Sequence, residues 1–159
     1  MRRKICLSWV MLLMLLAAGC GQSSKLNLQA AECAEVLWER IPFTDTLSAI
    51  DEQMSMVLYP VDEKDVAAQQ VYVSTGATAE EIAVFEAVDA AAAERLKEVV
   101  LQRLAEQKAS YADYLPVELP KLEDPYLRVT GPYVIFCVSG HNEKVSKEVE
   151  QLLYGNEEG

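Results

Sequence analysis

The sequence has few of the residues that catalytic and metal-binding sites use most. Its 159 residues include one histidine and four cysteines, and it contains no GxSxG elbow, HExxH zinc pair, P-loop or EF-hand loop. A structural zinc site takes about four nitrogen or sulfur ligands, more than one histidine and the two cysteines of the expected domain supply. We therefore expect no catalytic residues, no metal and no cofactor, and a protein that is not an enzyme.

Basic residues are scarce as well. The chain has 14 Lys plus Arg against 25 Asp plus Glu, a net charge of −11 at pH 7. Nucleic acids bind to basic surfaces, so this balance excludes a nucleic acid as partner. With 51% hydrophobic residues the chain is not disordered, and its length fits a single domain.

The longest apolar run, Ile5 to Gly19 with one break at Ser8, lies at the N-terminus. As a helix it would be about 22 Å long, too short for a hydrocarbon core of about 30 Å. Arg2, Arg3 and Lys4 precede the run, so we interpret residues 1–19 as a signal peptide. Removal of this segment would take away three positively charged residues and no acidic residue, so the net charge of the remaining chain would change from −11 to −14.

The end of this segment, Leu16 to Cys20 (LAAGC), resembles a bacterial lipobox, with Ala17 where leucine is usual. In such lipoproteins a diacylglyceryl group, with acyl chains such as palmitate, is attached to the cysteine, which becomes the N-terminus. The alternative is an ordinary secretory signal with an incidental Cys20. We expect Cys20 to be lipidated and residues 20–28 to form a tether at the extracytoplasmic face of the cell membrane. The anchor is lipid, because so acidic a domain is repelled by anionic membranes.

Residues 29–159 are expected to form one α+β domain. The spacing of apolar residues predicts a helix over 29–41 and a second, short helix within 44–58. Alternating apolar residues predict two strands, 71–73 and 82–88, about a turn at Gly76, and a helix from Ala90 to about Lys108 that is capped by Asp89. A connecting loop follows from Ser110 to Asp124. The chain then continues as a hairpin, 127–130 and 133–139, and ends in a helix from about Glu143 to Tyr154 with Asn142 as its cap. A capping box at 78–81 offers a competing possibility, one long helix through to Lys108.

The segments EIAVFEAVDAAAAERLKEVV and YVIFCVSGHNEKVSKEVEQL look like two copies of one unit. Both contain an apolar strand, a cap and an amphipathic helix, and both follow an earlier strand. We predict N-terminal helices followed by a ββαββα core, a four-stranded antiparallel sheet with two helices on one face. The strand from Tyr133 to Val138 is apolar on both sides, so the N-terminal helices or another protein must cover its second face.

Two surface segments are candidate recognition sites. The 110–124 loop and the residues after it offer Tyr111, Tyr114, Pro116 and Tyr126, amphipathic side chains beside prolines that limit their mobility. The alternative is that these tyrosines only fasten the loop to the core. The second candidate is the turn of small and hydroxyl residues at Ser74, Thr75, Gly76 and Thr78, which is otherwise simply a hairpin turn.

Other reactive groups receive less weight. Paired acids, such as Glu80 and Glu81 or the run at 62–65, are typical of glycosidases, but we expect a solvated acidic surface. Cys137 and His141 form a conceivable nucleophile and base, although a thiol inside an apolar strand is inert. Cys33 and Cys137 can form a disulfide or remain buried apolar residues, and we expect no bridge.

Three motifs, STGATAEEIAVFEA, SYADYLPVELPKLE and GPYVIFCVS, together resemble a family of uncharacterised lipoproteins, a domain of unknown function found mainly in Gram-positive anaerobes. The resemblance extends from about Ala31 to Leu153 and implies no catalytic residues. Members of that family look like companions of envelope machinery that O-acylates cell-surface polymers. We expect a membrane-anchored, non-catalytic module that binds a protein or an envelope component. The alternative is a lipoprotein that binds a small molecule or a cell-wall fragment.

Overall fold

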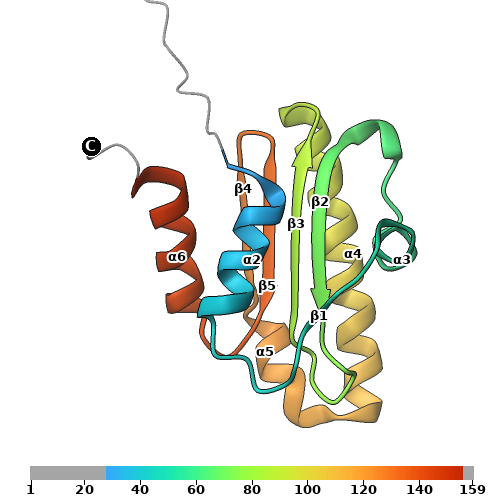
Figure 1. Cartoon of the computed structure of the whole chain (residues 1–159). Helices are drawn as coiled ribbons and strands as arrows, with labels where there is room; N and C mark the ends of the chain where they lie inside the picture. The colour runs from blue at the N-terminus through green and yellow to red at the C-terminus, as the bar shows by residue number, and fades with distance from the viewer. Residues whose placement is uncertain (1–27, 156–159) are drawn as a thin grey trace, which may run out of the picture.

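The computed structural model describes residues 28–155. The predicted signal peptide, Cys20 and the tether up to residue 27 lie outside the described residues. The helices and strands follow in this order (Figure 1): α2 (Ala30–Arg40), β1 (Ser48–Ala49), α3 (Glu52–Leu58), the 3-10 helix η1 (Glu63–Asp65), β2 (Val66–Val73), β3 (Glu81–Ala87), α4 (Ala90–Tyr114), the 3-10 helix η2 (Pro116–Glu118), α5 (Leu119–Glu123), β4 (Tyr126–Thr130), β5 (Tyr133–Val138) and α6 (Asn142–Tyr154).

The sheet has five antiparallel strands in the order β1-β2-β3-β5-β4. This confirms the α+β class and the ββαββα order, and it corrects the predicted count of four strands. The extra strand, β1, has two residues and lies in the segment where the sequence predicted only a helix. A strand this short leaves almost no periodic signal in the sequence.

Helices cover both faces of the sheet, which corrects the prediction of two helices on one face. One hydrophobic cluster joins α4 and α5 to the first face, with Phe85, Leu96 and Phe136 among its members. A second cluster joins α2 and α6 to the other face through side chains such as Leu37 and Ile135. Figure 1 shows α2 in front of the sheet, α6 beside it on the left and α4 behind it.

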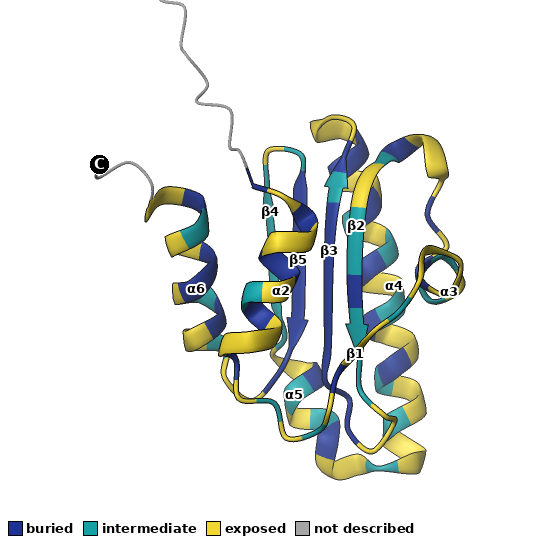
Figure 2. Ribbon diagram, viewed as in Figure 1, coloured by how far each residue is buried: buried dark blue, intermediate teal, exposed yellow. Residues whose placement is uncertain are grey.

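The central strands are buried on both sides. Every residue of β5 is buried, and so is every residue of β3 except Glu86 (Figure 2). The predicted cover for the second face of β5 is confirmed in part, since the N-terminal helix α2 lies on it, but the other covering helix is α6, which was predicted on the opposite face. The two hairpins meet at the antiparallel β3-β5 pair, but their helices lie on opposite faces. The similarity of the two segments is therefore one of element order and not of three-dimensional symmetry.

The predicted loop from Ser110 to Asp124 is wrong. Helix α4 continues to Tyr114, and η2 and α5 fill most of the remaining segment. Pro116 and Pro120 begin new helices at their first turns, where proline is tolerated because no backbone N–H is needed. The prolines in the sequence mark helix starts here and not irregular chain.

Short polar side chains set several boundaries. Asp89 begins α4 as predicted, its carboxylate accepting a hydrogen bond from the Ala92 N–H at 2.7 Å. The competing long helix from residue 78 is wrong, because β3 occupies its first turns. Asn142 is the first residue of α6 and not its cap, a position that His141 holds.

The packed domain begins one residue earlier than predicted. Leu28, assigned to the tether, is 5% exposed and belongs to the second cluster.

Cys33 and Cys137 are both free and buried in that cluster. In the described part of the chain no helix has the length and apolar character needed to cross a bilayer.

Candidate functional site

Four segments that are distant in the sequence meet at one end of the sheet, where β3 begins and β5 ends. They are residues 41–47, 74–80, 115–124 and 139–142, and we call this end the carboxylate pole. In Figure 1 it is the lower end of the domain, whereas the described chain enters α2 at the upper end. The following contacts hold the four segments together.

Glu80 is the first of three buried carboxylates at the pole. Its side chain is 1% exposed and accepts hydrogen bonds from the backbone N–H groups of Thr44 and Asp45, both at 2.9 Å. The Thr78 hydroxyl lies 3.2 Å away, and so does the Lys121 ammonium. Burial alone would raise the pKa of Glu80, but the two backbone donors and Lys121 outweigh it and hold the pKa below its ordinary value. Glu80 is therefore a buried anion that fixes the 41–47 segment.

Glu81 points to the opposite face of the sheet and is 2% exposed. It accepts hydrogen bonds from Arg103 Nη2 at 2.8 Å, from Gln107 Nε2 at 2.9 Å and from the Tyr59 hydroxyl. Burial, together with the charge of Glu81, raises the pKa of Tyr59 well above its ordinary value. A single carboxylate thus joins β3 to α4 and to the end of α3.

Glu118, in η2, completes the network. Its carboxylate accepts a hydrogen bond from the Ala79 N–H at 3.0 Å and one from Lys121 at 2.9 Å. Lys121 therefore bridges Glu80 and Glu118. Burial would lower the pKa of Lys121, but these two carboxylates raise it above its ordinary value, so the ammonium stays charged.

The expectation of a solvated acidic surface is wrong for Glu80 and Glu81. It is also wrong for Asp65, which is buried and bound by Arg95 through two contacts of 2.6 Å. The exposed Asp62 fits the expectation and pairs with Lys64. Each buried acid has a cationic partner that the pattern of acids alone did not reveal.

The structure brings the two predicted recognition segments into contact. Tyr111, on the last turns of α4, donates a hydrogen bond from its hydroxyl to the carbonyl of Thr78 in the turn. Tyr114 is 70% exposed and packs edge to face against Tyr111. Pro116 is exposed at the start of η2. Tyr126 lies elsewhere, half-buried in β4 against the second cluster.

The hydroxyl groups of the 74–78 turn are bonded within the protein. Ser74 donates to the Thr78 carbonyl at 2.6 Å, and the Thr75 hydroxyl donates to Asp45 at 2.6 Å. The bond from Thr75 lowers the pKa of Asp45. Gly76 has a φ of 95°, a conformation that glycine adopts without strain. The turn therefore fastens the 41–47 segment to the pole.

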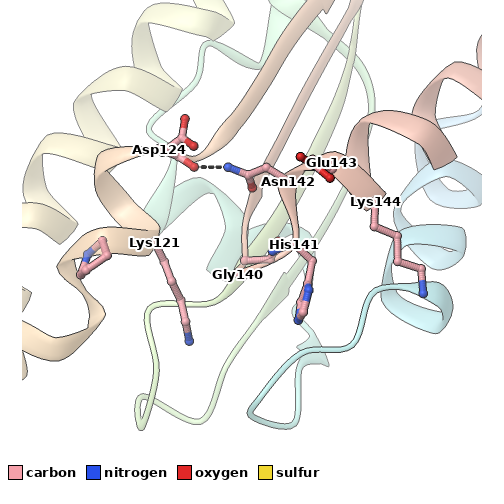
Figure 3. A pocket seen from close by; sticks show the side chains of 9 residues that line it. Lys121, Asp124, Gly140, His141, Asn142, Glu143 and Lys144 are labelled. Atoms are coloured by element: carbon pink, nitrogen blue, oxygen red, sulfur yellow. Dashed lines mark hydrogen bonds between the residues drawn. The ribbon is translucent and has the colours of Figure 1, made fainter.

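A cavity of about 510 Å³ opens at the pole between α5 and the start of α6. Figure 3 shows that the side chains of Lys121, His141 and Lys144 extend to the same side of it. Asn142 donates a hydrogen bond to the carbonyl of Asp124 at the back. The lining of the cavity thus has mixed charge: Lys121, whose ammonium is bonded to Glu80 and Glu118, Lys144, His141 and the acids Asp124 and Glu143.

Cys137 and His141 do not form a nucleophile and base. Cys137 is fully buried in β5, where burial raises its pKa to about 12, and His141 is exposed on the surface. Among residues 28–155, no three His, Cys, Asp or Glu side chains lie close enough together to hold a metal ion. The three buried carboxylates of the pole and Lys121 are engaged in structural bonds.

Sequence reasoning missed the partners of the buried acids. A signal was present in α4, where Arg103, Gln107 and Tyr111 continue the helical spacing of the buried residues Leu96 and Val100. Polar residues that lie on the same face of a helix as its buried apolar residues indicate a buried polar cluster. Glu81 has the same property in β3, since its side chain alternates in phase with Ala83 and Phe85.

Comparison with curated proteins and with solved structures found no match. A family model, "Domain of unknown function (DUF4358)", matches residues 40–139. The match covers more than half of the chain and contains all the residues that bind Glu80, Glu81 and Glu118. The chain therefore belongs to the DUF4358 family.

Proposed function

We propose that this protein is a lipid-anchored lipoprotein on the extracytoplasmic side of the cell membrane and acts as a non-catalytic binding module. Its partner is a protein or an envelope component, and its recognition surface is the carboxylate pole. The observation that carries the proposal is an exposed apolar corner on a rigid support. Tyr114 is 70% exposed and Val117 is 73% exposed, and they lie three residues apart where α4 turns into η2.

The support beneath this corner explains why exposed apolar side chains there suit binding. Tyr111, directly before the corner, is bonded to Thr78, and Glu118, directly after it, is bonded to Ala79 and Lys121. Both anchors lie within four residues of Tyr114. A corner fixed in advance loses little conformational freedom on binding, and exposed aromatic residues contribute strongly to protein interfaces.

The predicted anchor agrees with this geometry. The described chain enters the domain at the end opposite the carboxylate pole (Figure 1). With lipid on Cys20 and a short tether, the pole would face away from the membrane. The eight-residue strand β2 alone separates the two ends by about 26 Å. A partner in the envelope would then reach the corner without competing with lipid.

The cavity supports a second candidate, a lipoprotein that binds a small molecule or a cell-wall fragment. Its volume of about 510 Å³ lies in the range of ligand sites, which is about 300 to 1,000 Å³. Lys144 and His141 would bind a carboxylate or phosphate group of the ligand, and Asp124 and Glu143 in the same lining would bind its cationic or hydroxyl groups. Such a ligand would protect Lys144 from amine-modifying reagents, whereas a protein bound at Tyr114 and Val117 alone would not.

The anchor is tested by growing cells with a clickable palmitate analogue and comparing the wild type with Cys20→Ser. We expect label in the membrane-bound wild-type chain and none in the variant, which would be released from the membrane. Equal membrane retention of both, without label, would contradict lipid anchoring.

Binding is tested by crosslinking intact cells and recovering the protein from each strain. We expect a reproducible partner with the wild type that is lost from Cys20→Ser.

A further inference from the structure

The outer edge of β2 is unpaired along most of its length. β1 pairs only with Val73 and Tyr72, and the N–H of Ile50 adds one bond to the Val71 carbonyl at 3.1 Å. After Ile50 the chain turns away into α3. Within residues 28–155, no strand pairs with the edge over residues 66–70.

Backbone groups point outward along this edge. The Val71 carbonyl faces β1, and groups two residues apart in a strand face the same side. Gln69 therefore directs its own N–H and carbonyl away from β3. A bulge at the start of the strand, between Val66 and Ala68, marks the far end of the open stretch. Five residues of open edge are about 17 Å long.

A groove of about 440 Å³ runs along the open edge, with α3 as its other wall. Ile50, Asp51, Glu52 and Ser55 line that wall. Ser55 donates a hydrogen bond to the side chain of Gln69 at 3.0 Å, which joins the two walls. On the strand side Ala67 and Ala68 are exposed, and side chains this small let another backbone approach closely. The dimensions fit one extended peptide segment.

The opposite edge of the sheet shows what a protected edge looks like in this protein. On β4, Arg128 reaches Tyr154 of α6 at 3.0 Å and lies 3.8 Å from Glu150. Proteins commonly protect edge strands with charged side chains and covering helices. The 66–70 edge carries neither a charged residue nor a proline, so its protection is limited to the bulge at its start and to α3, which stands apart from it across the groove.

The charge of the groove selects among possible occupants. Asp51 and Glu52 are the only charged residues that line it, and both are acids. A second copy of the chain, paired edge to edge, would bring two such acid pairs together on molecules that each carry a net charge of −11, or −14 without residues 1–19. An extended segment with lysine or arginine has the complementary charge.

We propose that the groove between α3 and the 66–70 edge of β2 binds an extended, basic segment of a partner protein as an added strand of the sheet. This deepens the proposed function, on which it rests, by adding a second contact surface and the chemistry of the segment that fits it. Backbone hydrogen bonds to Gln69 provide the strand pairing, and Asp51 and Glu52 provide the preference for cationic side chains.

The test measures fluorescence anisotropy of peptides of about seven residues mixed with the full-length chain in detergent. The first probe alternates valine with threonine and carries a lysine at each end. A second probe has glutamate in place of lysine. Two further probes are lysine peptides in which alternate residues are N-methylated. In an extended peptide alternate N–H groups point to the same edge, so one probe has the N–H groups of one edge blocked and the other probe has those of the opposite edge blocked. We expect the lysine probe to bind about tenfold more tightly than the glutamate probe. N-methylation of one edge abolishes binding, and N-methylation of the other leaves it unchanged.

Matched variants separate backbone from side chain. Gln69→Pro removes the outward N–H and should abolish binding, whereas Gln69→Ala keeps that N–H and should bind within about threefold of wild type. Because Gln69→Pro can also disturb folding, Glu52→Lys provides an independent check and should reverse the preference between lysine and glutamate probes. Equal effects of the two N-methylated peptides, no binding at about 1 mM, or concentration-dependent dimerisation through this edge would overturn the inference. If the probes fail while intact cells still yield a partner, the edge inference falls and the binding-module proposal stands.

Discussion

The Glu81 carboxylate accepts a hydrogen bond from Arg103 Nη2 at 2.8 Å while the Glu81 side chain is only 2% exposed. The pair joins the central strand β3 to α4, the longest helix among residues 28–155. Tyr59 and Gln107 bind the same carboxylate from two other points of the core. Charges this deep in a protein are tolerated only when cations and donors surround them.

Removal of the Arg103 cation should therefore be costly. Arg103→Met leaves Glu81 charged without its cationic partner, and we expect the free energy of unfolding to fall by about 3 kcal/mol. Urea denaturation followed by circular dichroism measures it. Lys97→Met, which breaks an exposed pair with Glu94, is the matched control and should change stability by less than about 0.5 kcal/mol. Equal effects of the two substitutions would contradict a buried, cooperative cluster.

Stability should fall in acid. The pKa values of Glu80 and Asp65 lie below their ordinary values in the folded protein, so the unfolded chain binds protons first as the pH falls. These carboxylates contribute their full stability above about pH 5, and the contribution is lost as the pH falls through the folded pKa values. Urea denaturation at a series of pH values should show this decline. Glu80→Gln should be less stable at neutral pH and show a shallower decline, and an unchanged slope would contradict the role given to Glu80.

The buried thiols should be unreactive in the folded protein. Burial raises the pKa of both Cys33 and Cys137 to about 12. In a chain with Cys6→Ser and Cys20→Ser, a thiol reagent at pH 8 should label neither cysteine until denaturant is added, and then both. Rapid labelling of the native protein, or a disulfide found by mass spectrometry, would show that the second cluster packs differently.

The bond between the two predicted recognition segments is also testable. Tyr111→Phe removes one of the two hydroxyl donors of the Thr78 carbonyl and leaves the Ser74 hydroxyl in place, and we expect a loss of about 1 kcal/mol. Hydrogen exchange should become faster in residues 74–80 and 115–118. Tyr114→Phe, at an exposed position, should change neither. A similar effect of both variants would mean that the Tyr111 hydroxyl does not fix the corner.

Much of the sheet could be predicted from the sequence, because its signals are local. The apolar runs of β3 and β5, the turn glycine Gly76 and the cap Asp89 each depend on neighbouring residues only. The face that each helix covers could not be predicted this way. Helix α4 and helix α6 have similar apolar stripes, and only the path of the whole chain puts them on opposite sides of the sheet.

The carboxylate pole was predicted only in part. Tyr111, Tyr114 and the 74–78 turn were identified as candidates, but the contact between them depends on residues 33 positions apart. Glu80 and Glu81 looked solvated because paired acids usually are. Their cations, Lys121 and Arg103, lie 41 and 22 positions further along the chain, beyond any local pattern. Long-range ion pairs of this kind leave little mark on a single sequence.

The most direct test of the central claim is partner capture by crosslinking from intact cells, with variants at the exposed corner. The protein carrying Tyr114→Ser and Val117→Ser is compared with wild type and with a control protein carrying Val88→Ser and Leu101→Ser, two exposed apolar residues away from the pole. All three must be equally stable and membrane-bound. We predict that wild type and control recover the same partner and that the corner variant loses it. Equal recovery by all three would contradict the carboxylate pole as the recognition surface.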